Sequence, residues 1–293
     1  MSTKTTYSSN QQPNLQEGLD LSATPNGKHD LTIIKVGGAI VEDSQRLTHF
    51  LDLFAQTTTP KILIHGGGRR ATKIASALGI DTKMVEGRRV TDAPMLEVVT
   101  MVYGGLVNKN IVACLQARGI NALGLTGADM DTIRSHRRPP VTMTTNGTQA
   151  PCTIDYGFVG DVDNVNAQAL KTLIENGVTP IMAPLTHDGN GNILNTNADT
   201  IASETAKALA KHFNVTLIYC FEKPGVLSNP DDDSSVIPSI TQADFARLTT
   251  TGVISGGMKP KIENALKATE AGVKRVIITS AEAIDGHHGT IIV

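Results

Sequence analysis

The chain consists of short, continuously apolar runs that alternate with helical patterns from residue 31 onward. Short apolar runs of this kind are typical of strands buried on both faces, as in a parallel sheet between two layers of helices. The helical patterns have apolar residues three and four positions apart. We therefore predict an α/β fold, a three-layer α/β/α sandwich around a mainly parallel sheet. The predicted strands lie at 31–34, 62–64, 180–182, 217–219 and 276–278, and the predicted helices at 47–54, 169–174 and 201–209.

Three stretches interrupt this pattern. The segment 139–158 is rich in Thr, Gly and Pro, which predicts hairpins or a lid over a site. The turn-forming residues at 187–192 predict the tip of a hairpin. We expect this tip to divide an N-terminal lobe, 31–190, from a C-terminal lobe, 191–293. Residues 1–30 are polar, so we expect a disordered N-terminal extension there.

Composition narrows the class of function. The 293 residues are 40% hydrophobic and 18% charged, an ordinary balance for a globular protein. The net charge of -2 argues against nucleic-acid binding, which needs a basic surface. The three cysteines form no Cys-x-x-Cys pair and the histidines have no metal-ligand spacing, so no metal site is predicted. We find no secretory signal and no 18-residue apolar stretch, and we expect a cytoplasmic protein without a membrane span.

Three glycine-rich turns are the first candidates for binding chemistry. Gly37-Gly38 and Gly66-Gly67-Gly68 each follow a predicted strand, and Gly256-Gly257 opens a predicted helix. Glycine at such a turn lets backbone N–H groups approach an anion, and a helix N-terminus adds positive potential. Tight turns also use glycine for steric reasons alone, so each turn by itself is ambiguous. The P-loop and Rossmann glycine patterns are both absent, which excludes those phosphate sites.

Two lysines accompany these turns. Lys35 lies near the end of an apolar strand, where it either reaches solvent or meets a negative ligand at the sheet edge where α/β proteins bind ligands. On the helix after residue 257, a rotation of 100° per residue places Lys261 beside the apolar face. The same rotation puts Lys259 about 160° away from Lys261. Because the two cannot reach one bound phosphate, Lys261 is the better candidate.

Two polar motifs complete the candidate chemistry. Asp199 stands at the start of a predicted helix, so it is either a helix cap or a carboxylate that orients two active-site lysines. Arg88 and Arg89 follow a short predicted strand. A guanidinium binds a carboxylate bidentately, which suits recognition of an amino acid, and an exposed surface pair is the alternative.

Together these motifs resemble the amino acid kinase superfamily and, within it, the N-acetylglutamate kinase family. The resemblance runs from residue 31 to residue 293, and the order of the motifs is as specific as the motifs themselves. The Arg-Val-Thr and Asn-x-Asn-Ala-Asp elements separate this family from aspartate, uridylate and carbamate kinases. The matching motifs are Ile34-Lys35-Val36-Gly37-Gly38, Ile64-His65-Gly66-Gly67-Gly68, Gly87-Arg88-Arg89-Val90-Thr91, Val107-Asn108-Lys109, Gly124-Leu125-Thr126-Gly127, Gly157-Phe158-Val159-Gly160-Asp161, Asn195-Thr196-Asn197-Ala198-Asp199 and Gly256-Gly257-Met258-Lys259-Pro260-Lys261.

The resemblance implies ATP-dependent phosphorylation of the γ-carboxylate of N-acetyl-L-glutamate, a step of arginine biosynthesis. The lysines would hold the phosphates and the aspartate would orient both lysines, while the N-terminal lobe would bind the acylated amino acid and form a homodimer. The C-terminal lobe would bind ATP with Mg²⁺. The implied residues are catalytic Lys35, Asp199 and Lys261, substrate-binding Gly66, Gly67, Arg89 and Asn195, and phosphate-binding Gly37, Gly38 and Gly257.

This chain departs from the family pattern at two places. Phe221-Glu222 stands where the family usually has Thr-Asp or Ser-Asp, which changes the expected nucleotide contacts. Thr196 stands where the middle residue of the Asn-x-Asn element is usually Val.

Other functions stay open from sequence alone. The acyl group is either acetyl or succinyl, and Arg69 or Arg70 are candidates to bind the extra carboxylate of N-succinyl-L-glutamate. Another amino acid kinase, such as glutamate 5-kinase or aspartate kinase, is the next alternative. The last is a non-catalytic module that senses nucleotide or arginine, against which the joint presence of Lys35, Asp199 and Lys261 argues.

Overall fold

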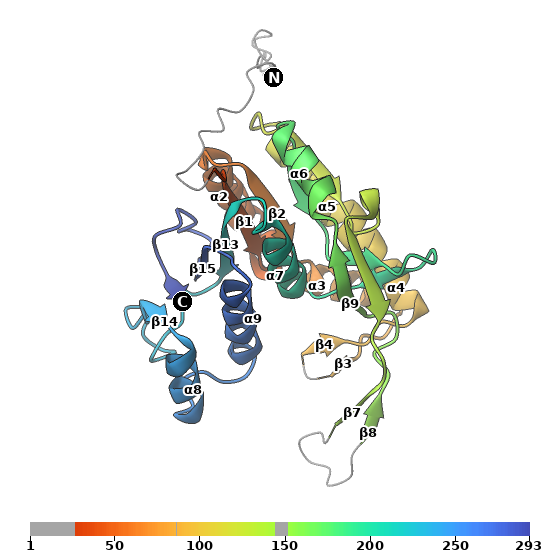
Figure 1. Cartoon of the computed structure of the whole chain (residues 1–293). Helices are drawn as coiled ribbons and strands as arrows, with labels where there is room; N and C mark the ends of the chain where they lie inside the picture. Colours follow the sequence, from red (N-terminus) through yellow and green to blue (C-terminus); the bar gives the residue numbers. More distant parts are fainter. Residues whose placement is uncertain (1–26, 86, 144–151) are drawn as a thin grey trace, which may run out of the picture.

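An eight-stranded sheet forms the centre of the molecule (Figure 1). The computed structural model describes residues 27–85, 87–143 and 152–293. The strand order is β14-β16-β15-β13-β1-β2-β10-β5, and every neighbouring pair from β15 to β5 is parallel. One end differs, because β16 lies antiparallel to β15. The strands are β1 (Asp30–Val36), β2 (Lys61–His65), β5 (Ala122–Leu125), β10 (Thr179–Met182), β13 (Asn214–Phe221), β14 (Ser239–Ile240), β15 (Arg275–Ser280) and β16 (Thr290–Ile292).

Helices cover both faces of this sheet, which confirms the predicted three-layer sandwich. Successive side chains of a strand point to opposite faces. In β1, Leu31 and Ile33 therefore enter one core, with α6 to α9, while Ile34 and Val36 enter the other, with α1 to α5. The helices are α1 (Gly38–Glu42), α2 (Ser44–Gln56), α3 (Gly68–Ala77), α4 (Ala93–Val99), the π-helix η1 (Thr100–Val107), α5 (Asn108–Gln116), α6 (Ala167–Glu175), α7 (Ala198–Leu209), α8 (Gln242–Thr250) and α9 (Met258–Glu270), with a short 3₁₀ turn η2 (Asp129–Asp131).

A smaller four-stranded sheet and two hairpins lie beside the large sheet. The turn at 188–192 joins two antiparallel strands, so the hairpin tip predicted there is confirmed. A hairpin also occupies part of 139–158, as predicted, and its tip at 144–151 lies outside the described residues. The small sheet contains β12 (Ile193–Asn195), β11 (Leu185–His187), β6 (Ile133–Arg137) and β9 (Gly160–Val165), and the hairpins are β3 (Met84–Val85) with β4 (Arg88–Arg89) and β7 (Val141–Met143) with β8 (Cys152–Ile154).

One continuous helix is formed by α4, η1 and α5. Its 24 residues, 93–116, are long and apolar enough to cross a membrane by length and composition, so the expectation that no such apolar stretch exists is wrong. The burial of its side chains explains the apolar composition. Val98, Val102 and Ile111 are almost completely buried in the core shared with α2 and α3, as in a core helix. The helix begins at the Asp92 cap, whose carboxylate accepts the Met95 N–H over 2.9 Å.

The residues just before β1 are held by hydrogen bonds. Asn214 donates its backbone N–H to the His29 carbonyl oxygen, and the Lys28 ammonium donates to the Ala210 carbonyl oxygen. These bonds tie the residues just before β1 to β13 and to the end of α7. The rest of the predicted extension, 1–26, lies outside the described residues.

Candidate functional site

Two glycine turns lie side by side at the carboxyl edge of the large sheet. They meet because β1 and β2 are parallel neighbours, with Val36 opposite His65. The Gly66 N–H donates to the Val36 carbonyl oxygen over 3.0 Å. A Cβ atom on Gly66 would stand 3.1 Å from the Gly38 nitrogen, so this close approach of two backbones requires glycine. The backbone N–H groups that the sequence singled out are therefore together.

Lys35 and Asp199 form a buried ion pair beside these turns. Lys35 is 7% exposed, and its Nζ lies 2.7 Å from Asp199 Oδ1. Asp199 is in the first turn of α7, yet the helix is capped by Asn197, whose side chain accepts the N–H groups of Asp199 and Thr200. The Asp199 carboxylate is therefore not the helix cap, and it faces the lysine.

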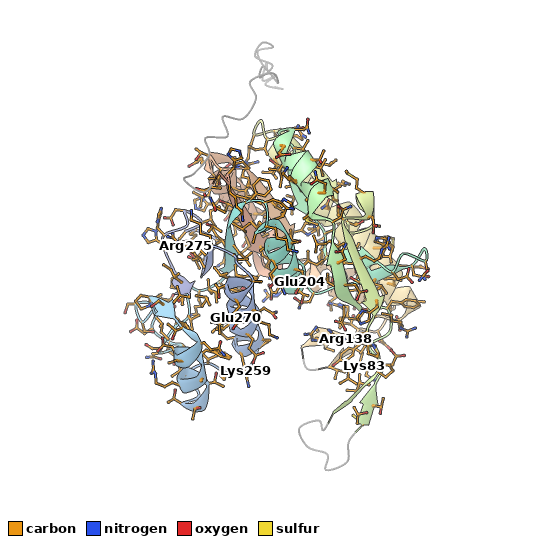
Figure 2. All side chains as sticks on the ribbon, in the orientation of Figure 1. Lys83, Arg138, Glu204, Lys259, Glu270 and Arg275 are labelled. Carbon is orange, nitrogen blue, oxygen red and sulfur yellow. The ribbon has the colours of Figure 1, made fainter. Side chains whose placement is uncertain are left out.

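Phe221 lies close to both candidate lysines. The Nζ atoms of Lys35 and Lys261 are 5.5 and 3.7 Å from the centroid of its ring. An aromatic face attracts a cation, so the ring stabilises both ammonium groups. Burial lowers the pKa of Lys261, the Asp199 charge raises it, and the Lys35 charge lowers it further. Lys259 is exposed near the start of the same helix (Figure 2), so the predicted placement of the two lysines around α9 is confirmed.

These lysines line a cavity of about 450 Å³. Glu222 also lines it and pairs with Arg69, whose Nη2 lies 3.7 Å from Glu222 Oε1. Gly257 caps α9 but is exposed and does not line this cavity, so its phosphate contact stays a prediction. The lining residues are Lys35, Gly37, Gly38, Ala39, Ile40, Gly68, Arg69, Phe221, Glu222, Lys223, Gly225, Met258 and Lys261.

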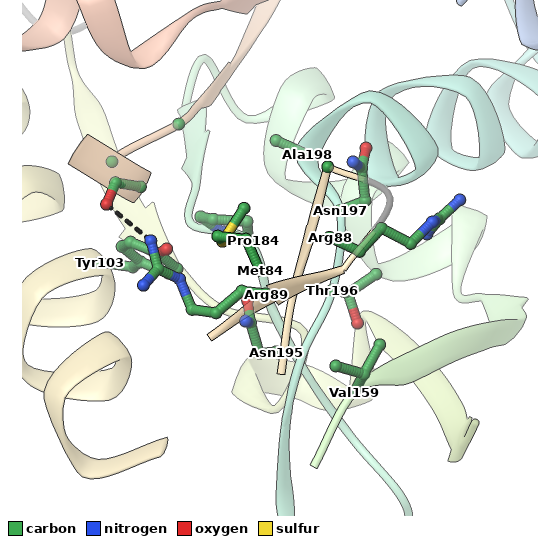
Figure 3. A pocket seen from close by; sticks show the side chains of 14 residues that line it. Met84, Arg88, Arg89, Tyr103, Val159, Pro184, Asn195, Thr196, Asn197 and Ala198 are labelled. Atoms are coloured by element: carbon green, nitrogen blue, oxygen red, sulfur yellow. Dashed lines mark hydrogen bonds between the residues drawn. The ribbon is translucent and has the colours of Figure 1, made fainter. Parts of the chain in front are cut away.

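Arg89 lines a second cavity, of about 220 Å³ (Figure 3), which shares Gly68 with the first. Its Nη2 donates to the Gly68 carbonyl oxygen and to Thr72 Oγ1, each over 2.9 Å. Its Nη1 lies 3.4 Å from Thr82 Oγ1. All these partners are neutral, so the guanidinium is held in position while its charge stays available to an anion.

Asn195 faces the same cavity from the small sheet. Its Nδ2 donates to Thr91 Oγ1 over 2.9 Å, which fixes the side-chain amide. Thr91 is fully buried, so the anchor is rigid. The cavity is lined by Gly66, Gly67, Gly68, Met84, Gly87, Arg88, Arg89, Tyr103, Val159, Pro184, Asn195, Thr196, Asn197 and Ala198.

Arg88 lines this cavity as well and differs from Arg89. Figure 3 shows the two side chains leaving β4 in opposite directions, as alternation along a strand requires. Within the described residues, the Arg88 guanidinium has no hydrogen bond or ion pair. Burial lowers its pKa, and the nearby Arg138 charge lowers it further. Arg88 is thus a partly buried cation whose own charge is not neutralised by contact.

Tyr103 is a site residue that sequence reasoning missed. A Cβ atom on Gly67 would lie 2.9 Å from the Tyr103 ring, so the ring packs directly on the glycine turn. Tyr103 belongs to the π-helix, and none of the motifs or elements predicted from the sequence includes it. Its proximity to Gly67 depends on tertiary structure and has no local signal.

The two arginines after the second glycine turn do not line the Arg89 cavity. Arg69 pairs with Glu222 at the nucleotide-sized cavity, and Arg70 lines a separate cavity with Glu42 and Leu106. The role of Arg69 or Arg70 in binding the acyl group stays a prediction.

Metal-binding side chains do not gather at this site. Across residues 27–85, 87–143 and 152–293, no group of three or more His, Cys, Asp or Glu side chains is arranged to hold a metal ion. Mg²⁺ that is bound to a nucleotide requires fewer protein ligands, because it keeps several waters and takes only one or two carboxylates in addition to the phosphates. Glu222, at the mouth of the lysine cavity, fits that role.

The chain is similar to proteins of one family. It matches the Amino acid kinase family over residues 30–280. An acetylglutamate kinase of Bacteroides thetaiotaomicron is 61% identical over 265 residues, which cover 90% of this chain and 99% of that protein.

Solved structures agree with this similarity. The protein smu.665 of Streptococcus mutans has a TM-score of 0.71 and 29% identity, with 89% of this chain and 98% of that chain covered. Carbamate kinase from Giardia lamblia has a TM-score of 0.62 at 16% identity, with 90% and 98% covered, and shares the fold. By sequence and by fold, the chain belongs to the amino acid kinase family and, within it, to the acetylglutamate kinases.

Proposed function

We propose that the protein transfers the γ-phosphoryl group of ATP to the γ-carboxylate of N-acetyl-L-glutamate, a step of arginine biosynthesis. The observation that carries the proposal is the meeting of two cavities at the paired glycine turns. One cavity holds Lys35 and Lys261, and the other holds Arg89, while Gly68 lines both. Relatives at 59–61% identity bear the name acetylglutamate kinase.

The chemistry needs positioning and charge stabilisation more than proton transfer. A carboxylate is already ionised and nucleophilic at pH 7, so no general base is required. Its oxygen attacks the γ-phosphorus, and the bond to the ADP oxygen breaks. Lys35 and Lys261 stabilise the negative charge on the transferring group, and Asp199 holds Lys35 in position. The N–H groups of the glycine turns bind the phosphoryl oxygens, except that of Gly66, which donates to the Val36 carbonyl oxygen.

Substrate recognition falls to the Arg89 cavity. Arg89 binds the α-carboxylate through the charge that its neutral partners leave available. Asn195 donates its second amide hydrogen to the same substrate, because Thr91 uses the first. The substrate then lies with its γ-carboxylate toward the glycine turns, as in-line transfer requires.

ATP enters the lysine cavity as its Mg²⁺ complex. The metal neutralises charge on the phosphate oxygens when it is bound. Glu222 would approach it from the mouth of the cavity. Residues 31–190 then supply most of the cavity for the acylated amino acid, to which Asn195 is added from the C-terminal lobe. Residues 191–293 supply Phe221, Glu222 and Lys261 to the nucleotide cavity, whose other side is formed by Lys35 and the first glycine turn.

The assembly proposed is a cytoplasmic homodimer joined through the N-terminal lobe. The long helix leaves Met101 and Leu106 on its outer side with 55% and 39% exposure. Exposed apolar side chains on one helix are suited to a contact between subunits. Light scattering with Met101→Lys tests the contact, because a charge there would disrupt the dimer and leave a monomer.

A substrate panel tests the activity. The enzyme is assayed with MgATP and N-acetyl-L-glutamate, N-succinyl-L-glutamate, L-glutamate or L-aspartate, and ADP release is measured. We expect turnover with an N-acylated glutamate and little with the free amino acids. Preference for free glutamate or aspartate would make the protein a glutamate 5-kinase or aspartate kinase. Calorimetric binding of the ligands without turnover would make it a sensing module.

Arg88 favours a second candidate substrate, N-succinyl-L-glutamate. An unpaired, partly buried guanidinium in the substrate cavity suits a further carboxylate, which acetyl lacks and succinyl has. If so, Arg88→Gln lowers kcat/KM for the succinyl compound by about tenfold and leaves the acetyl compound within about twofold. Arg137→Gln is the control, because Arg137 pairs with Asp155 outside the cavity. Equal effects on both substrates would leave N-acetyl-L-glutamate as the substrate.

A further inference from the structure

His65 lies directly beneath the second glycine turn and is bonded through both ring nitrogens. It ends β2 and is completely buried. Its Nδ1 lies 2.9 Å from the Gly66 carbonyl oxygen, and its Nε2 lies 3.1 Å from Asn108 Nδ2. The same amide nitrogen donates to the Ile181 carbonyl oxygen over 2.8 Å. A buried chain of hydrogen bonds therefore links the turn to α5 and β10.

Only one placement of the hydrogen atoms satisfies every donor and acceptor in this series of hydrogen bonds. The Gly66 carbonyl only accepts, so His65 Nδ1 must carry a hydrogen. The Ile181 carbonyl also only accepts, so the NH₂ group of Asn108 faces it and the second hydrogen of that group goes to His65. Nε2 is then bare and accepts. Burial lowers the pKa of His65 to about 4, which keeps the ring neutral at physiological pH.

The bond to Gly66 fixes the direction of the next N–H group. In a trans peptide the carbonyl and the following N–H point in opposite directions. The carbonyl of Gly66 points down to the ring, so the Gly67 N–H points up. Gly67 lines the substrate cavity, and its nitrogen is near the Gly38 turn. His65 thereby aims a backbone donor at the place where the two cavities meet.

The π-helix brings a second support to the same turn. Tyr103 packs on Gly67, and Asn108, five residues later, holds His65. In an α-helix, residues five apart point about 140° away from each other. The wider turn of a π-helix, with bonds from residue i to residue i+5, brings them to nearly the same side. Because of the π-helix at Thr100–Val107, one helical segment supports the turn twice, through Tyr103 against Gly67 and through Asn108 against His65.

We propose that His65 and Asn108 are positioning residues that hold the Gly66–Gly67 peptide with its N–H toward the transferring phosphoryl group. The inference rests on the proposed kinase function and adds two residues that touch no substrate. They act on the rate of transfer through geometry, because a small displacement of a donor from the transition state lowers kcat. Ground-state binding of ATP and of the acylated amino acid depends on other groups.

Kinetics of matched variants test the proposal. We expect Asn108→Leu and His65→Leu to lower kcat by about tenfold or more and to change both KM values by less than about threefold. His65→Asn should restore most of kcat, because its amide nitrogen replaces Nδ1 as the donor to Gly66. Leu115→Ala is the control, since it removes a buried side chain from the same helix away from the turn. Losses of kcat no larger than that of Leu115→Ala would overturn the proposal.

Nitrogen NMR of the intact wild-type enzyme tests it without relying on variants that fold poorly. With ¹⁵N-labelled histidine, we expect the His65 ring to carry hydrogen on Nδ1 and none on Nε2, unchanged from pH 8 to about pH 5.5. A ring with hydrogen on Nε2 would overturn the proposal. The result is independent of turnover, so it separates this inference from the proposed function, which fails only if wild-type enzyme transfers no phosphoryl group.

Discussion

Two lysines on neighbouring strands are equally buried and have different partners. Lys35 lies near the carboxyl end of β1 and Lys61 at the amino end of β2, and each is 7% exposed. Their ammonium groups lie 5.5 and 5.1 Å from aromatic rings. Lys35 has a carboxylate, that of Asp199, at 2.7 Å. Lys61 donates to the carbonyl oxygens of Thr57 and Ala55 over 2.6 and 3.1 Å.

The partners explain the different uses of these lysines. The carbonyl groups that bind Lys61 belong to the end of α2, so the ammonium satisfies orphan carbonyls and lies at the negative end of the helix dipole. Carbonyl oxygens do not neutralise the charge, and burial lowers the pKa of Lys61 to about 8. Lys35 is instead neutralised by a carboxylate and faces a cavity. Burial alone therefore does not identify a catalytic lysine; its partner and a cavity do.

The largest effect is expected from removing the cavity lysines. Lys35→Ala or Lys261→Ala should lower kcat by about 10²-fold or more, with a smaller change in KM, because both act mainly on the transition state. Steady-state kinetics with thermal unfolding of each variant measure this. Lys259→Ala is the control on the exposed side of α9 and should be nearly silent. Equal losses at Lys259 and Lys261 would contradict the assignment.

Asp199→Asn tests the role of the carboxylate that pairs with Lys35. The amide keeps the size of the side chain and loses the charge that faces Lys35, while the Asn197 cap of α7 is untouched. We expect kcat to fall by about 10²-fold with the fold and ATP binding kept. Turnover within a few-fold of wild type would show that the lysine needs no anionic partner.

Arg89→Lys extends the comparison to a cation with only neutral partners. Lysine keeps the charge and loses the planar fork that binds a carboxylate through two bonds. The KM for the acylated amino acid should rise by about tenfold with a smaller change in kcat. Initial-rate kinetics at saturating MgATP measure it. An unchanged KM would assign the α-carboxylate to another group, with Arg88 the nearest candidate.

Lys61→Met should change stability and leave kcat unchanged. The pKa of Lys61 is about 8 in the native state and near 10.5 in the unfolded chain, so between these values the unfolded chain binds more protons. The free energy of unfolding of the wild type should therefore rise through that interval, relative to the variant. Urea unfolding at pH 7.5 and pH 10 measures the difference. A loss of kcat in Lys61→Met would mean that Lys61, like Lys35, contributes to catalysis.

The sequence predicted features that have local patterns. The apolar runs marked β1, β2, β10, β13 and β15, and the spacing on α9 separated Lys261 from Lys259. It also located the two glycine turns that follow β1 and β2, which the parallel pairing of these strands brings to one edge.

Features created by tertiary contacts could not be predicted in this way. Nothing local to Lys61 shows that its ammonium meets the end of α2, and nothing local to Tyr103 places its ring on Gly67. From sequence, Phe221-Glu222 is a departure that changes the expected nucleotide contacts, and the structure shows the Phe221 ring close to the ammonium groups of both Lys35 and Lys261. The choice between a helix cap and a lysine-orienting carboxylate for Asp199 also needed the hydrogen bonds of the Asn197 cap.

The place of β1 in the large sheet has a consequence for how the chain folds during synthesis. β1 pairs with β2 on one edge as soon as residue 65 is available, and with β13, from residue 214, on the other. At about 5–20 residues per second, ribosomes take on the order of ten seconds between these points. For that time β1, whose side chains are almost all buried in the native sheet, has an open hydrogen-bonding edge, which is prone to pair with other chains. Such long-range closure also predicts slow refolding.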